Sequence, residues 1–187
     1  MRNVVVLVLV GCVPAAAPRA EVAVPSDDGS LHVHESRNDP SVTEGETTLA
    51  VDPDTAYDTM TDYAQWTSVF PDLRQVIVTR ASGVDARITF IRRDGNRDNL
   101  HFHNQPAARM VWFEDTGGRA KVWAEIVFFS GERPGTTRVH SRLYAAVHGF
   151  ASLFVSDDRL RALRQQRVRA DLVHVRDYFA RRVSAAP

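Results

Sequence analysis

Six consecutive stretches of alternating apolar and polar residues constrain the fold of this chain more than any other feature of its sequence. Their ranges are 74–82, 85–93, 98–104, 108–115, 121–130 and 136–147. Successive side chains of a β-strand point to opposite faces, so this alternation predicts strands with one apolar and one polar face. The connections are short and carry turn signals, above all Asp94-Gly95-Asn96. Strands joined in this way form an antiparallel sheet, whose apolar face must pack against another element.

A long amphipathic segment near the C-terminus supplies that element. Ser156, Asp157 and Asp158 form a favourable helix start. Apolar residues then recur at helical spacing, ~3.6 residues per turn, for about seven turns. They are Leu160, Leu163, Val168, Leu172, Val175, Phe179 and Val183. Arginines interleaved with aspartates occupy most of the other face, which favours a salt-bridged, solvated surface; contact with anionic lipid headgroups is the alternative.

The stretch at 51–73 predicts two short helices that follow a first strand at 43–51. Asp52 is a favourable N-cap, and a proline follows it at the first helical position. Asp62 begins a second short helix, and Pro71 ends it. The predicted order is therefore a strand, two short helices, six strands and one long helix.

This order of elements resembles the START-like helix-grip (SRPBCC) superfamily, which includes polyketide cyclase/dehydrase-type and lipid-transport proteins. The local sequence also resembles the family pattern, a D-Y-x-x-W segment followed by F-P-x-[hydrophobic]-x-x-V. The matching residues are Asp62, Tyr63, Trp66, Phe70, Pro71, Leu73 and Val76. The resemblance implies an α+β fold, in which a curved antiparallel sheet of about seven strands surrounds the long C-terminal helix. The two short helices, between strands 1 and 2, would close one end.

The resemblance further implies an apolar cavity between sheet and helix, which holds a hydrophobic small molecule in many relatives. The inward-facing candidates for contact with such a ligand are Trp66, Phe70, Phe90, Phe102, Trp112, Phe128, Leu143, Leu172 and Val175. A filled core needs the same apolar stripe, so residue type alone does not distinguish a ligand cavity from a filled core. We expect a domain that binds or transports a hydrophobic molecule or lipid. The alternatives are a polyketide cyclase/dehydratase-type enzyme and a ligand-free envelope interaction domain.

Motifs for catalysis are absent from the sequence. It contains no G-x-S-x-G elbow, P-loop, G-x-G-x-x-G or C-x-x-C motif. His101 and His103 share one strand face, with Asp98 and Glu114 as candidate neighbours. A solvated face is the preferred interpretation, and a metal-binding or general-base role is the alternative. We therefore expect no catalytic residue, metal or cofactor. The net charge of zero gives no argument for a nucleic-acid partner.

The N-terminal residues MRNVVVLVLVGC indicate export. Their apolar run is too short for a transmembrane helix, which needs ~20 residues, and matches a secretory signal. The last four resemble a bacterial lipobox, and Cys12 is the only cysteine of the chain, so we expect its lipidation. The alternatives are an ordinary signal peptide cut near residues 15–20, with the thiol discarded, and an artefact of the start site.

The segment at 13–42 has the composition of a linker, although its residues 31–35 could form a short strand. The expected organisation is a signal peptide with lipobox at 1–12, a linker at 13–42 and a START-like domain at 43–187. The expected location is the cell envelope, with the exported domain lipid-anchored and facing the periplasm.

Overall fold

The structure is a computed structural model that describes residues 31–116, 120–147 and 155–184. Its strands are β1 (His32–Glu35), β2 (Val42–Leu49), β3 (Leu73–Ala81), β4 (Asp85–Arg92), β5 (Arg97–Gln105), β6 (Met110–Asp115), β7 (Ala120–Ser130) and β8 (Thr137–Val147). Its helices are α1 (Pro53–Thr61), α2 (Trp66–Val69) and α3 (Asp157–Ser184), with short 3₁₀ turns η1 (Tyr63–Gln65) and η2 (Pro106–Ala108). Cys12 and the predicted signal peptide lie outside the described residues.

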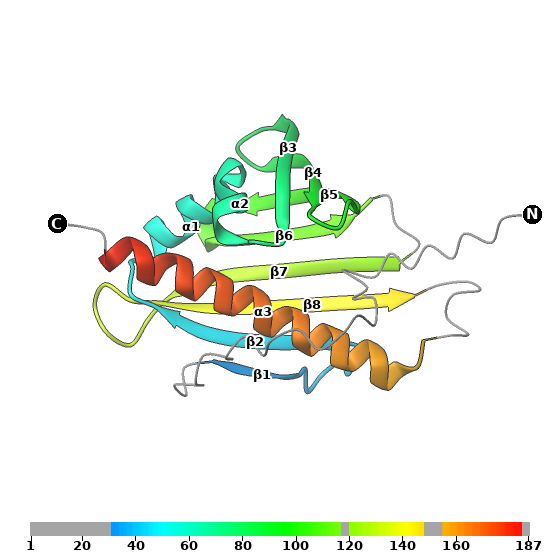
Figure 1. Cartoon of the computed structure of the whole chain (residues 1–187). Coiled ribbons are helices and arrows are strands. Elements are labelled where there is room, and N and C mark those ends of the chain that lie inside the picture. Colours follow the sequence, from blue (N-terminus) through cyan, green and yellow to red (C-terminus); the bar gives the residue numbers. More distant parts are fainter. Residues whose placement is uncertain (1–30, 117–119, 148–154, 185–187) are drawn as a thin grey trace, which may run out of the picture.

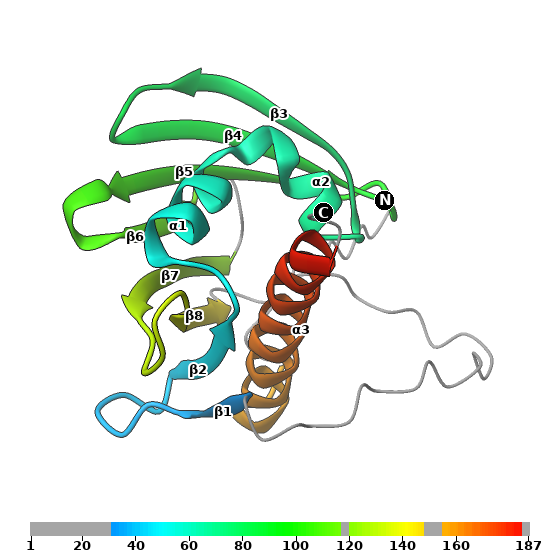
Figure 2. The ribbon, with the colours of Figure 1, turned by 90° about the vertical axis from the view of Figure 1, so that its left-hand side faces the viewer.

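The strands form one 8-stranded sheet in the order β1-β2-β8-β7-β6-β5-β4-β3 (Figure 1). All pairs between neighbouring strands are antiparallel, and β3 to β8 follow one another as in the predicted meander. The chain reaches the far edge of the sheet between β2 and β3, and α1, η1 and α2 lie on this connection. Figure 2 shows the sheet curving around α3, which occupies its concave side. The predicted α+β helix-grip architecture is confirmed.

The sheet gains its additional strand from residues that were expected to belong to the linker. In β1, His32 lies opposite Glu46 and Glu35 lies opposite Thr43. Leu31, just before β1, is buried in the core. Antiparallel pairing satisfies the backbone groups along the outer side of β2, which explains why a short polar segment is ordered there. The short helices consequently follow the second strand rather than the first.

The start of α1 is built as its sequence predicts. Asp52 caps the helix, because its Oδ1 accepts a hydrogen bond of 2.9 Å from the backbone N–H of Thr55, and Pro53 occupies the first turn. Asp62 behaves differently. It precedes η1 without capping it through its side chain, and its Oδ2 instead accepts a bond of 2.6 Å from the Gln65 amide. These contacts set the position of the segment that carries Trp66.

Gly45 in β2 allows α3 to approach the sheet closely. A Cβ atom at this position would lie 2.5 Å from Cγ1 of Val168 and 2.7 Å from Cδ1 of Leu172. Both distances are shorter than van der Waals contact, so any larger residue would push α3 outward. The absence of a side chain at Gly45 thus helps to set the width of the space between helix and sheet.

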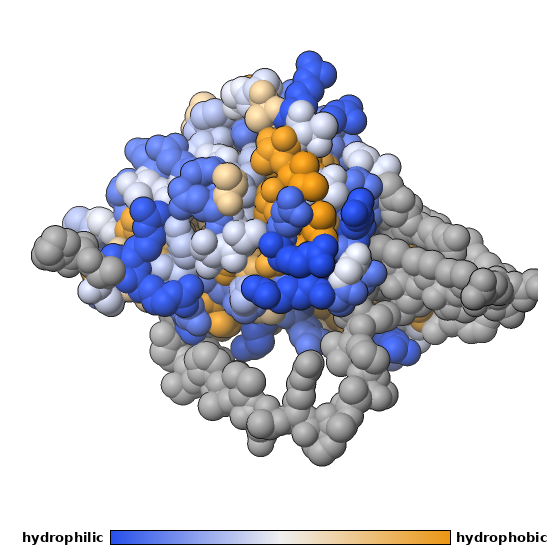
Figure 3. Space-filling model, turned by 45° about the horizontal axis from the view of Figure 1, so that its top comes forward, coloured by the Kyte–Doolittle hydropathy of each residue, from blue (hydrophilic) through white to orange (hydrophobic). Residues whose placement is uncertain are grey.

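The edge strand β3 carries exposed apolar side chains. Ile77 and Val78 are each 40% exposed. Figure 3 shows an apolar strip on the part of the surface where β3 lies, with hydrophilic side chains on both sides. Among the described residues, none of the helices is both long enough and apolar enough to cross a membrane.

Candidate functional site

A cavity of about 90 Å³ lies between α3 and the concave face of the sheet. Most of its wall is apolar and comes from the short helices, the sheet and α3. The predicted ligand-contacting residues in this wall are Trp66, Phe70, Phe90, Phe128, Leu143, Leu172 and Val175. Other apolar side chains complete it, namely Met60, Leu73, Leu100, Phe113, Val122, Ala124, Ile126, Val139 and Val168.

Strand alternation explains which residues of β7 and β8 reach the cavity. Every second residue of β7 from Val122 to Phe128 lines it, and so does every second residue of β8 from Val139 to Leu143. The intervening residues point to the outer face, where Trp123 stacks on Tyr144 with 6.0 Å between ring centroids and 9° between planes. Both faces of these strands match the predicted alternation.

Two of the predicted ligand-contacting residues do not line the cavity. Phe102 is 0% exposed and packs behind the wall, against Tyr63 with ring centroids 4.7 Å apart. Trp112 lies on the outer face, because its neighbour Phe113 points inward and consecutive strand residues alternate. There, the Trp112 ring stacks on His103 with 3.9 Å between centroids. Phe102 thus faces inward as predicted but does not reach the cavity, whereas the predicted inward position of Trp112 is wrong.

The aromatic residues of the short helices close one end of the cavity. Trp66 packs against Phe70 and Phe90, with ring centroids 5.0 and 5.4 Å away. Its indole Nε1 donates a 3.0 Å hydrogen bond to the Met60 carbonyl. Nearby, the Tyr63 hydroxyl donates a 2.5 Å bond to Asn104 Oδ1, and burial raises the pKa of this hydroxyl above its ordinary value. These hydrogen bonds satisfy polar atoms in an apolar surrounding and hold the rings in place.

Charged side chains form another part of the cavity wall. We call Asp72, Arg92, Asp98, Arg167 and Asp171 the charged cluster. Arg92 on β4 donates through Nε to Asp98 Oδ2 at 2.6 Å and through Nη1 to Asp72. Arg167 on α3 donates through Nη1 to Asp72 at 3.2 Å and through Nε to Asp171 at 2.8 Å. All of these residues except Asp72 line the cavity, together with Asp115 and Ser141.

The two aspartates that contact Arg167 differ in their protonation behaviour. Desolvation opposes the ionisation of Asp72, but the charges of Arg167 and Arg92 outweigh it and hold the pKa of this carboxyl below its ordinary value. At Asp171 desolvation prevails, so its pKa is raised although Arg167 pairs with it. Burial lowers the pKa of Arg167, but Asp171 and Asp72 more than compensate and raise it. The cavity thus contains a fixed cation and a carboxyl that protonates more readily than usual.

Sequence reasoning missed the charged cluster, although part of the signal was present. Arg92 continues the inward alternation of Ile88 and Phe90, and Asp98 continues that of Leu100. Arg167 and Asp171 are one helical turn apart, beside the apolar stripe of α3. Arginine and aspartate are usually solvated, however, so residue type alone predicted exposed positions for all of these side chains.

Of the two predicted carboxylate neighbours of the histidine pair in β5, Glu114 is adjacent and Asp98 is not, and a third carboxylate contacts both rings. Asp98 belongs to the inward face and pairs with Arg92. Glu114 lies opposite His101 in register, on β6. The carboxylate in contact with both imidazoles is that of Asp85, on β4. This cluster lies on the outer face and does not belong to the cavity.

No protein-family model matches the chain, and a search of curated proteins finds no match. Solved structures do match. The Zhui aromatase/cyclase from Streptomyces sp. R1128 aligns with a TM-score of 0.66 and 16% identity, over 77% of this chain and 96% of that chain. A START superfamily protein from Mycobacterium smegmatis aligns with a TM-score of 0.62 and 11% identity, over 75% of this chain and 97% of that chain. The di-domain ARO/CYC BexL of the BE-7585A biosynthetic pathway aligns with a TM-score of 0.61 and 17% identity, over 78% of this chain and 48% of that chain. These matches show the shared fold.

Proposed function

We propose that this chain, which has the START-like helix-grip fold, binds a hydrophobic small molecule between α3 and the sheet. The observation that carries the proposal is the cavity itself, with its largely apolar wall and the charged cluster on one part of it. Apolar walls with a few convergent polar groups are typical of small-molecule sites. The ligand would carry a polar group that contacts the charged cluster, while its apolar part contacts residues such as Phe128 and Leu172.

The size of the cavity restricts how such a ligand binds. Its volume of about 90 Å³ is below the ~300–1,000 Å³ typical of pockets for drug-sized ligands. A lipid or a multi-ring molecule therefore requires α3 or wall side chains to move outward. The wall contains many flexible aliphatic side chains, such as Leu143 and Leu172, that could adopt other rotamers.

A dye with the same two chemical parts tests this proposal. Anilinonaphthalene sulfonate has apolar rings for the wall and a sulfonate for the arginines. The dye has several rings, so its binding requires the same outward movement of wall side chains, and we expect the full chain to bind one dye molecule with a rise in fluorescence. Ala124 lines the cavity, so Ala124→Leu should fill part of it and weaken binding, by about ten-fold if roughly 1.4 kcal/mol is lost.

The matched control is Ala146→Leu, on β8. Ala146 is opposite Lys121 in register and lies on the outer face of the sheet, so its enlargement should leave dye binding unchanged. Circular dichroism would verify the fold of both variants. Equal dye affinity of the two folded variants would contradict binding in the cavity. Native mass spectrometry of the purified full chain would then identify any natural ligand by its mass.

A second candidate function is that of a cyclase-type enzyme, and Asp171 is the observation that favours it. A carboxyl with a raised pKa on a cavity wall can act as a general acid or base, because it gains and loses a proton nearer to neutral pH. Two of the similar structures are described as aromatase/cyclase proteins. Turnover of a polyketide-type thioester should then be lost in Asp171→Asn while dye binding remains. Unchanged turnover in this variant would exclude Asp171 as the catalytic residue.

The sequence also supports a location in the cell envelope. Cys12, at the end of the lipobox-like sequence, would carry the acyl chains, and the segment after it would tether the folded domain to the membrane. Cys12→Ser should move the protein from the membrane fraction to the soluble fraction. Membrane association that is unaffected by this substitution would argue against a lipid anchor.

A further inference from the structure

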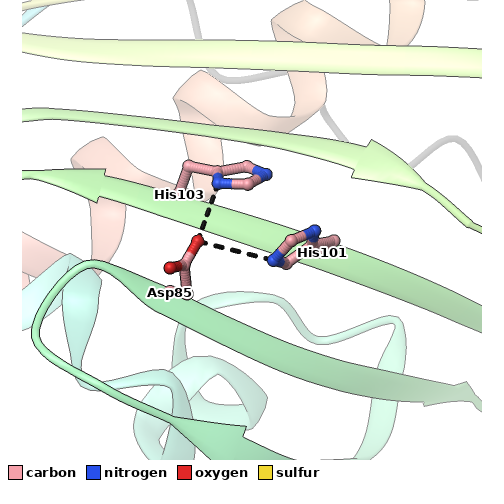
Figure 4. Close-up of side chains that lie close together, drawn as sticks. All are labelled: Asp85, His101 and His103. Atoms are coloured by element: carbon pink, nitrogen blue, oxygen red, sulfur yellow. Dashed lines mark ion pairs between the residues drawn. The ribbon is translucent and has the colours of Figure 1, made fainter.

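Three potential metal ligands meet on the outer face of the sheet. They are Asp85 on β4 and His101 and His103 on β5, and Figure 4 shows their side chains pointing toward one another. Asp85 Oδ1 lies 3.4 Å from His101 Nε2 and 2.8 Å from His103 Nδ1. One ligand atom from each of the three residues lies within 4.8 Å of the other two.

The position of these side chains follows from the β4–β5 hairpin. Asp85 is opposite His103 in register, and His101 is two residues from His103 on the same face. Phe102, between the histidines, points to the buried side of the sheet. The cluster is therefore separated from the cavity by the sheet, so its function can be tested independently of ligand binding there.

Ring stacking restrains the orientation of His103. Its imidazole lies on the Trp112 ring with 3.9 Å between centroids and 16° between planes, and the two imidazoles are 4.0 Å apart. His103 Nε2 is buried and has no hydrogen-bond partner among the described residues. Stacking thus holds His103 Nδ1 toward Asp85, without a hydrogen bond from the other ring nitrogen. Preorganised ligands lose little entropy when they bind a metal ion.

We propose that Asp85, His101 and His103 form a binding site for a zinc-type divalent transition-metal ion. Two imidazole nitrogens and one carboxylate oxygen suit Zn²⁺ and its neighbours, whereas Ca²⁺ and Mg²⁺ prefer oxygen ligands alone. Tetrahedral Zn²⁺ with bonds of ~2.0–2.1 Å holds its ligand atoms about 3.3 Å apart. The 3.4 Å between Asp85 and His101 already matches this spacing, and the 2.8 Å contact with His103 needs only a small opening.

A surface pocket beside the cluster provides access and room for the remaining ligand. Its volume is about 200 Å³, and its lining includes Asp85, His101, Arg80, Ser82 and Arg87. Three protein ligands leave a fourth tetrahedral position open. The positive charges of Arg80 and Arg87 would repel a bound cation. An anionic oxygen ligand in the fourth position would offset this repulsion better than a neutral ligand. The complete site would thus contain the metal ion, three side chains and one oxygen ligand from solvent or a small anion.

Isothermal titration with ZnCl₂ tests the site. The full chain would carry Cys12→Ser and no polyhistidine tag, so that neither a thiol nor a tag contributes ligands. We expect one Zn²⁺ per chain with a Kd of about 1 µM or lower, and weakening of at least about ten-fold in His101→Ala and in Asp85→Asn. CaCl₂ should give no comparable binding.

The matched control is His34→Ala. His34 lies 3.5 Å from Glu44, but among the described residues this pair belongs to no group of three potential metal ligands. This substitution should leave Zn²⁺ binding unchanged. Co²⁺ should in addition produce a visible absorption band in wild type that is absent from folded Asp85→Asn. The proposal is overturned if wild type takes up no Zn²⁺ at millimolar concentration, or if folded His101→Ala and Asp85→Asn bind it as tightly as His34→Ala does. Ca²⁺ binding as tight as Zn²⁺ binding would likewise overturn it.

Discussion

Arg167 in α3 and Asp72 in the turn after α2 are 95 residues apart in the sequence, yet their Nη1 and Oδ2 atoms lie 3.2 Å apart. The same oxygen of Asp72 accepts a hydrogen bond from Arg92 on β4. One carboxylate therefore joins the long helix to the sheet. Because Arg92 and Arg167 also line the cavity, the stability of the fold and the chemistry of the cavity depend on the same side chains.

Asp72→Asn should lower the free energy of unfolding by about 1–3 kcal/mol, because two arginines lose an ionised partner. Arg92 is the more affected, since its side chain is 10% exposed. The 39% exposure of Asp72 keeps the loss below the ~3–5 kcal/mol of a fully buried pair. Urea denaturation would measure the change. As a control, Asp158→Asn removes an aspartate that is 87% exposed and should change the value by less than about 0.5 kcal/mol.

The contribution of Asp72 should depend on pH in a defined direction. Its pKa is lower in the folded protein than the ordinary value of 3.8, so its ionised form stabilises the fold above that value. This stabilisation is lost as pH falls through the lower folded-state pKa. The difference between wild type and Asp72→Asn should therefore be constant from about pH 7 to 5 and shrink below about pH 4. Urea denaturation of both proteins over this pH range tests the prediction. A difference in the free energy of unfolding that persists unchanged to pH 2 would contradict the lowered pKa of Asp72.

Asp171→Asn should have the opposite consequence for stability. The pKa of Asp171 is raised in the folded protein, so the fold loses stability as pH rises from the unfolded-state to the folded-state value. Ionisation of this carboxyl therefore costs the folded state stability, and Arg167 retains Asp72 as a partner after the substitution. We expect a free energy of unfolding equal to or above that of wild type, measured as for Asp72→Asn. A loss as large as that of Asp72→Asn would disprove the proposed desolvation cost.

Gly45→Ala should destabilise the packing of α3 on β2. The new Cβ would lie within 2.7 Å of side-chain atoms of Val168 and Leu172, both of which are buried. Overpacking of this kind costs about 1–3 kcal/mol. The control is Gly83→Ala, where a Cβ meets nothing within 4 Å, so that stability should remain the same or rise by up to about 1 kcal/mol. Similar thermal denaturation midpoints for the two variants would show that α3 moves aside without cost.

The sequence by itself determined the strands, the long helix and the inward face of most strands. These features depend on the repeat of two residues in a strand and ~3.6 in a helix, which is a local property of the backbone. The inward position of Phe128 and Leu143 was therefore predictable from alternation. The same rule places Trp112 and Phe113 on opposite faces, and the hairpin turn at Asp94-Gly95 contains enough information to align β4 with β5.

Only the tertiary structure decided which polar residues come together. Asp72, Arg92 and Arg167 lie on three separate elements, and their residue types are the same as those of solvated surface positions. The strand β1 is also ordered by its pairing with β2. The volume of the cavity likewise depends on the close approach of α3 at Gly45. Periodicity defines which face of an element is buried, but the contacts of that face depend on the packing of segments far apart in the chain.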